Sequence, residues 1–101
     1  MTEEDNKLIL NNIRALQGQI TSSLRSVSVE LREKVIVRQG LFDSDATVDD
    51  FEIMSVACAE IIADYPWGYD LEEIIKYVPA SENMKHLKNL IYLRHKQNYY
   101  K

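Results

Sequence analysis

The sequence is poor in cysteine and glycine, and each scarcity excludes a class of protein. Its one cysteine, Cys58, cannot form an intramolecular disulfide or a zinc site made of several thiolates. Its glycines, Gly18, Gly40 and Gly68, are too far apart to form a phosphate-binding loop. The 101 residues are 46% hydrophobic and 28% charged, which is typical of a folded protein. We therefore expect one small soluble domain over residues 1–101.

Long hydrophobic runs are absent as well. Apolar runs such as Ile61-Ile62-Ala63 are far shorter than the roughly 20 residues that cross a bilayer. The acidic start, Glu3-Glu4-Asp5, differs from the cationic start of a signal peptide. We therefore expect a cytoplasmic protein that does not enter a membrane.

Positive charge is missing from the middle of the chain. The formal net charge is −4, yet residues 43–73 carry ten acids and no lysine or arginine, while residues 74–101 carry six cations and one acid. Two interpretations remain open. The basic C-terminal block neutralises the acids within the fold, or the acids face a basic partner and accelerate its association. The ten acids are Asp43, Asp45, Asp49, Asp50, Glu52, Glu60, Asp64, Asp70, Glu72 and Glu73.

Hydrophobic spacing predicts two helices. The first, over residues 3–22, carries an apolar stripe at helical spacing that consists of Ile9, Ile13, Leu16 and Ile20. The second covers residues 47–65, and its stripe consists of Phe51, Met54, Cys58, Ile61 and Tyr65. At its start, Thr47 and Asp50 resemble a capping box with Asp in place of the usual Glu.

Alternating hydrophobicity predicts a hairpin of strands over residues 24–31 and 35–42. A three-residue turn, Arg32-Glu33-Lys34, would place Leu31 opposite Val35 on the same face. A short last strand is predicted over residues 89–95.

Residues 70–78 fit two structures. Their apolar spacing is compatible with a helix, whereas Ile74, Ile75, Tyr77 and the terminating Pro79 favour a strand, which we adopt. The predicted order is α-β-β-α-β-β. This order indicates a two-layer α/β (α+β) fold in which a sheet containing an antiparallel hairpin packs against two helices.

No arrangement of residues typical of an enzyme is found. Cys58 lies on an apolar helical stripe and has no neighbouring base, so we expect a core residue. His86 and His95 have no adjacent carboxylate. Glu72 and Glu73 would point to opposite faces of a strand and cannot act as a pair.

Metal and nucleic-acid sites are not predicted either. The acid cluster of Asp43, Asp45, Asp49 and Asp50 lacks the central glycine and terminal glutamate of a calcium loop. Basic and aromatic residues within 85–101 are typical of single-strand binding, but the net acidity of the chain repels phosphate. We expect no metal ion, no cofactor and no nucleic-acid partner.

Trp67 stands in a turn between the second helix and the strand at 70–78. It either closes the end of the core or is an exposed anchor for a partner, because tryptophan is enriched among the residues that dominate binding energy.

Five short runs carry a family resemblance. They are LRSVSVE (24–30), LFD (41–43), TVDD (47–50), VACAEIIADYP (56–66) and LIYLR (90–94). Over about residues 20–95 the chain resembles small bacterial immunity proteins of polymorphic and contact-dependent toxin systems. The resemblance implies a sheet with a helical layer, including strands at 70–78 and 89–95.

The resemblance and the acidic segment together suggest a non-enzymatic immunity protein. It would bind and neutralise a basic toxin domain, such as a nuclease, through an acidic surface. The alternative is a regulatory or structural interaction subunit, which includes a homodimer formed through a sheet edge. The predicted partner-binding residues are Asp43, Asp45, Asp49, Glu52, Trp67, Asp70, Glu72 and Glu73.

Overall fold

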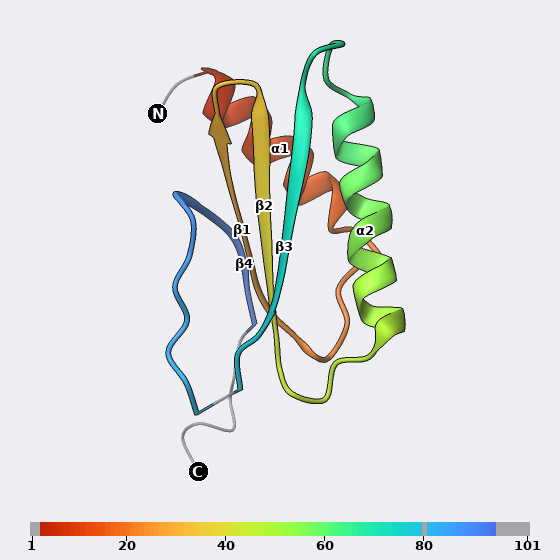
Figure 1. Cartoon of the computed structure of the whole chain (residues 1–101), viewed down its shortest axis with the longest axis vertical. Helices are drawn as coiled ribbons and strands as arrows, with labels where there is room; N and C mark the ends of the chain where they lie inside the picture. Colours follow the sequence, from red (N-terminus) through yellow and green to blue (C-terminus); the bar gives the residue numbers. More distant parts are fainter. Residues whose placement is uncertain (1–2, 80, 95–101) are drawn as a thin grey trace.

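The computed structural model describes residues 3–79 and 81–94 (Figure 1). Its elements follow the predicted order α-β-β-α-β-β. They are α1 (Glu3–Ala15), β1 (Leu24–Arg32), β2 (Val35–Phe42), α2 (Val48–Ala63), β3 (Asp70–Tyr77) and β4 (Asn89–Leu93). Residues 70–77 form a strand, as we predicted. The predicted last strand ends two residues early, at Leu93, and residue 95 lies outside the described residues.

The strands form one sheet in the order β3-β2-β1-β4. β1 pairs antiparallel with β2 and with β4, whereas β3 runs parallel to β2. A parallel pair needs a long crossover, and α2 supplies it. Figure 1 shows the helices on one side of the strands and residues 81–88 on the other. The predicted α+β fold is confirmed, and its sheet is mixed.

α1 is shorter than predicted. It ends at Ala15, and Gly18 follows in the left-handed region at φ 76°. Ile20 therefore lies beyond the helix, and it is exposed, as is Ile13. The buried face of α1 instead carries Asp5, Leu8, Asn12 and Ala15. The predicted stripe missed this face because two of its residues are polar.

The hairpin turn is also one residue shorter than predicted. Arg32 lies opposite Val35, so the turn consists of Glu33 and Lys34, and Glu33 has a positive φ of 57°. Alternation could not select this register because both faces of β2 are covered. Ile36 is buried in the core that includes both helices, and Val37 is buried on the other face.

Residues 79 and 81–88 are attached to the face of the sheet that lies away from the helices. Arg25 Nη1 donates hydrogen bonds to the carbonyls of Val78 (2.7 Å) and Pro79 (2.9 Å). Gln39 Nε2 donates to the Lys85 carbonyl at 2.8 Å. This segment explains why β1 and β2 are buried on both faces, with Ser26, Ser28 and Gln39 covered on the face away from the helices.

Two apolar clusters join the helices to the sheet. One consists of Leu8, Ala15, Val29, Ile36, Ala57 and Ile61, and the other of Leu16, Leu24, Val27, Phe42 and Met54. Gly40 lies in the middle of β2, where the Met54 thioether occupies the space that a Cβ would need. This close approach holds α2 against the sheet.

Candidate functional site

The solvent-exposed face of α2 is acidic. Asp49, Glu52, Val56, Glu60 and Ala63 are exposed and recur at helical spacing. The 16 residues of α2 include no lysine or arginine. At 1.5 Å per residue the helix is about 24 Å long. We call this surface the acidic face of α2.

The C-terminal end of α2 has the wrong charge for helix stability. Glu60 lies in the last turn and Asp64 is the C-cap, so acids stand where the helix dipole favours cations. The two are also four residues apart, where like charges repel. A helix selected for stability alone would carry Lys or Arg there, so these acids point to a role at the surface.

A corner rich in aromatic residues follows α2. The indole of Trp67 is 99% exposed, the largest exposed fraction among the large hydrophobic side chains in the described part of the chain. Gly68, with φ at 100°, makes the turn that projects it. Tyr65 and Tyr69 lie beside it, with their ring centroids 5.2 Å apart. We call residues 65–70 the Trp67 corner.

A hollow of about 440 Å³ opens at this corner. Its lining combines aromatic rings with a carboxylate, and it consists of Ile62, Tyr65, Pro66, Trp67, Gly68, Tyr69 and Asp70. The rings already attract cations of the chain itself. Lys7 Nζ lies 4.7 Å from the centroid of Tyr65, and Lys34 Nζ lies 5.9 Å from that of Tyr69. The corner therefore suits a partner surface that carries both apolar and cationic groups.

Three of the ten central acids have partners within the fold. Asp43 forms an ion pair with Arg94 at 2.9 Å. Asp50 accepts hydrogen bonds from the Thr47 backbone N–H and from Ser23 Oγ, which lower the pKa of its carboxyl. The bond from Thr47 is the one that the predicted capping box requires.

Glu73 is the third. Ser55 Oγ donates to its Oε1 at 2.9 Å and Cys58 Sγ donates to its Oε2 at 3.1 Å. Its side chain is therefore held beneath α2, whereas Glu72 is exposed. The two point to opposite faces of β3, as predicted.

The other seven acids are exposed. Within residues 3–79 and 81–94 their side chains make no hydrogen bond or ion pair. They are Asp45, Asp49, Glu52, Glu60, Asp64, Asp70 and Glu72. For most of the segment, the described part of the basic C-terminal block does not supply neutralising contacts.

Cys58 belongs to a buried polar cluster rather than to a reactive site. Burial raises the pKa of its thiol to about 12, against the opposing charge of Arg38, and the hydrogen bond to Glu73 adds to the rise. Arg38, only 1% exposed, donates from Nε to Asn12 Oδ1 at 2.8 Å. A protonated thiol is a poor nucleophile, so the predicted structural role of Cys58 fits this geometry.

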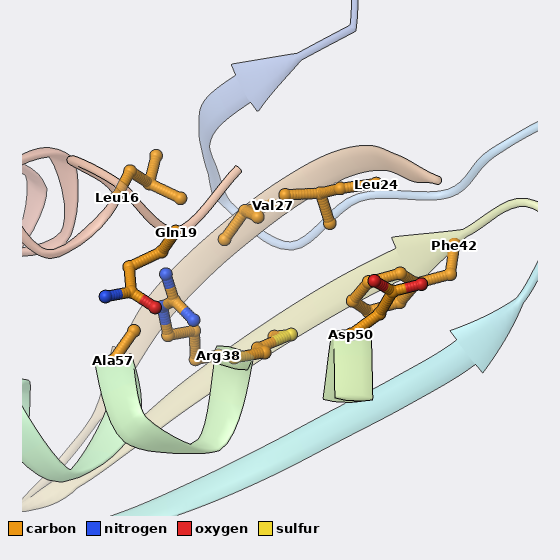
Figure 2. A pocket seen from close by; sticks show the side chains of 9 residues that line it. Leu16, Gln19, Leu24, Val27, Arg38, Phe42, Asp50 and Ala57 are labelled. Atoms are coloured by element: carbon orange, nitrogen blue, oxygen red, sulfur yellow. The ribbon is translucent and has the colours of Figure 1, made fainter. Parts of the chain in front are cut away.

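The cavity beside Arg38 is too small for a substrate. Figure 2 shows the guanidinium and the Gln19 carboxamide pointing toward one another between α2 and the sheet. The volume open to solvent-sized molecules is about 10 Å³, which is room for one water molecule at most.

No cluster of metal-ligating side chains exists among the described residues. No helix in the described ranges is long and apolar enough to span a bilayer.

A family model described as MafI2 immunity protein matches residues 5–96. The chain belongs to the MafI2 immunity protein family. Its role is therefore the neutralisation of a protein toxin, and the resemblance noted over residues 20–95 is confirmed. No curated protein sequence matches the chain.

In this MafI2 immunity protein, the predicted partner-binding residues form two groups. Asp43, Asp45, Asp49 and Glu52 lie at or near the N-terminal end of α2, and Trp67, Asp70 and Glu72 lie beyond its C-terminal end. The groups are separated by most of the helix. Glu73 belongs to neither, because Ser55 and Cys58 hold it beneath α2.

Two residues that link these groups were not singled out from the sequence. Glu60 and Asp64 continue the acidic face toward the Trp67 corner. Their spacing from Glu52 and their position at the C-terminal end of a helix without cations were the available signals.

Proposed function

We propose that this protein neutralises its toxin by laying the acidic face of α2 and the Trp67 corner across a basic, substrate-binding cleft of a toxic nuclease. The observation that carries the proposal is the continuity of unpaired acids along α2 with a fully exposed tryptophan at its end. We propose that binding takes place in the cytoplasm and involves no chemistry by the immunity protein.

The charges argue for a basic partner. Asp49, Glu52, Glu60 and Asp64 extend along about 24 Å of helix, without a cation on that element. A nuclease must attract the phosphates of its substrate, so its cleft is positively charged. Complementary potentials would steer the two proteins together and align α2 with the cleft.

Trp67 would supply affinity that charges alone do not. Its exposed indole can bury a large apolar area in a recess of the partner, and tryptophan is prominent among energetic hot spots. Carboxylates of Asp64 and Asp70 lie near it in sequence and favour cationic side chains at the rim of that recess. Substrate would then be excluded by occupancy of the cleft.

The test begins with tagged protein expressed in the native host. The recovered toxin domain is produced with and without the immunity protein, and cell survival is scored. Surface binding kinetics then compare wild type with Glu52→Lys and Glu60→Lys. We expect each reversal to slow association about tenfold at low salt and to reduce its salt dependence.

Glu82→Lys is the matched control. It changes the net charge equally but lies in the segment on the opposite face of the sheet. If Glu82→Lys slows association as much as Glu52→Lys, the acidic face has no specific role. If the recovered toxin lacks nuclease activity, the proposed class of toxin is wrong.

A further inference from the structure

β3 leaves one long edge of the sheet open. It is an edge strand in the order β3-β2-β1-β4, and its partner on one side is β2. The backbone N–H of Asp70 donates to the Lys34 carbonyl at 2.9 Å, and that of Val78 donates to the Phe42 carbonyl at 2.8 Å. The backbone N–H and C=O groups of even-numbered positions therefore face β2. The N–H and C=O groups of odd-numbered positions face outward, and no described residue forms a backbone hydrogen bond with them there.

The side chains on one face of β3 are complementary to themselves. Glu72, Ile74 and Lys76 alternate on the face away from α2, because Glu73 lies beneath α2. The order is acid, apolar, base. Reversing the strand gives base, apolar, acid, so an antiparallel copy presents the matching set. Lys76 is also the sole Lys or Arg between Arg38 and Lys85.

We propose that this edge binds a second copy of the chain, with two β3 strands pairing antiparallel about a two-fold axis at Ile74. Glu72 of each copy then lies opposite Lys76 of the other, and the two Ile74 side chains meet on the axis. The sheet becomes continuous across the dimer. Such isologous pairing closes by symmetry and removes an open edge from each copy.

The backbone geometry is consistent with this register. The outward groups belong to odd positions, so Leu71 pairs with Tyr77 and Glu73 with Ile75 as hydrogen-bonded pairs. Even positions then form the non-hydrogen-bonded pairs, whose side chains approach most closely, at roughly 4.5–5.5 Å between Cβ atoms. Glu72 and Lys76 are thus placed at the positions where opposite charges interact best.

Neighbouring registers lose this match. An axis at Glu73 places two glutamates against each other, and an axis at Ile75 places Lys76 opposite Ile74 and Glu72 opposite Val78. The other edge strand suits pairing less well. β4 has only five residues, and its pairing with β1 is interrupted by a register shift. The open edge of β3 is therefore the favoured interface between copies.

Sedimentation equilibrium of the purified full chain over micromolar to millimolar concentration tests the proposal. At physiological ionic strength the Debye length is about 8 Å. Salt therefore screens the repulsion between the net charges of the two copies more than the attraction within the directly opposed pairs. We expect a monomer–dimer equilibrium. Glu72→Lys and Lys76→Glu should each weaken dimerisation about tenfold, because each converts two attractive pairs into repulsive ones.

The double variant Glu72→Lys with Lys76→Glu is the decisive control. It exchanges the charges, so dimerisation should return to near the wild-type level. A wild-type chain that stays monomeric throughout would overturn the proposal, and so would a double variant no better than either single one. Hydrogen exchange that protects β3 only when toxin is added would assign the edge to the toxin instead. Protection of cells by these variants is measured separately. A chain that does not dimerise but still protects cells would contradict the dimer without contradicting the proposed toxin-binding face.

Discussion

Asp43 and Arg94 form an ion pair with 2.9 Å between Oδ2 and Nη2. Arg94 Nη1 also donates to the Ser22 carbonyl at 2.7 Å, so this residue ties the end of β4 both to the loop before α2 and to the loop before β1. In the described part of the chain, no other cation from the C-terminal block forms an ion pair with an acid of residues 43–73. Lys88 pairs instead with Asp5 of α1. The exposed acids of α2 are thus available to a partner.

Trp67→Ala should weaken toxin binding without weakening the fold. We expect a loss of at least about 2 kcal/mol, or roughly thirtyfold in Kd, mainly through faster dissociation. Because the side chain is fully exposed, the free energy of unfolding should change by less than about 0.5 kcal/mol. Binding kinetics and urea denaturation measure the two effects. Leu90→Ala, at an exposed position on β4, should change neither.

The raised pKa of Cys58 predicts a loss of stability in alkali. In the unfolded chain the thiol ionises near its ordinary pKa of about 8.5, whereas in the folded protein it stays protonated to about pH 12. The unfolded state therefore releases a proton first as pH rises. Stability contributed by this group is complete below about pH 8.5 and falls progressively above it.

Urea denaturation at successive pH values measures this effect, and Cys58→Ala should show a flatter decline. The same burial predicts that iodoacetamide alkylates Cys58 only after unfolding. Rapid alkylation of the native protein at pH 8 would show that the thiol is accessible and that the described geometry is wrong.

Arg38 and Asn12 form a buried polar contact that a double-mutant cycle can resolve. Asn12→Ala removes the acceptor of the Arg38 Nε proton and leaves a buried charge less well satisfied, which should cost about 3 kcal/mol of stability. Adding Arg38→Met should recover part of that loss, because an apolar chain of similar length then fills the space. Equal stability of the single and double variants in urea denaturation would contradict this account.

Asp50 should stabilise the start of α2. Asp50→Ala removes the acceptor of the Thr47 N–H and Ser23 Oγ hydrogen bonds and should cost about 1 kcal/mol. Because these bonds lower the pKa of Asp50, its contribution is present above about pH 4 and is lost as pH falls below that value. Thermal unfolding measured above and below about pH 4 tests this. Asp49→Ala, one residue away and without a partner among the described residues, is the control.

Residues 70–77 show how far sequence patterns reach. Leu71, Ile74 and Ile75 satisfy helical spacing, yet they form β3 because β-branched residues suit the edge of a sheet and pair with β2 throughout its length. Their β propensity and the following Pro79 were sufficient to predict the strand. The parallel direction was not predictable, because it depends on the crossover made by α2.

Arg38 shows why the hairpin register was missed. A charged residue at the core face of β2 contradicts the usual alternation, and its partners, Asn12 on α1 and Cys58 on α2, lie on other elements. The same dependence on tertiary contacts limits what the sequence predicts about the candidate site. Sequence identified the acids and Trp67, but the hydrogen bonds that hold Glu73 under α2 and the full exposure of Trp67 follow from tertiary packing.

The most direct test of the proposed toxin interface uses Trp67 as a probe. It is the single tryptophan, so labelling the immunity protein with 5-fluorotryptophan gives one ¹⁹F resonance. In the free protein this resonance should shift between H₂O and D₂O, because the indole is fully exposed. On saturation with unlabelled toxin domain, we predict a new chemical shift and loss of the solvent isotope effect. An unchanged resonance that keeps its isotope effect in the complex would contradict the Trp67 corner as part of the interface.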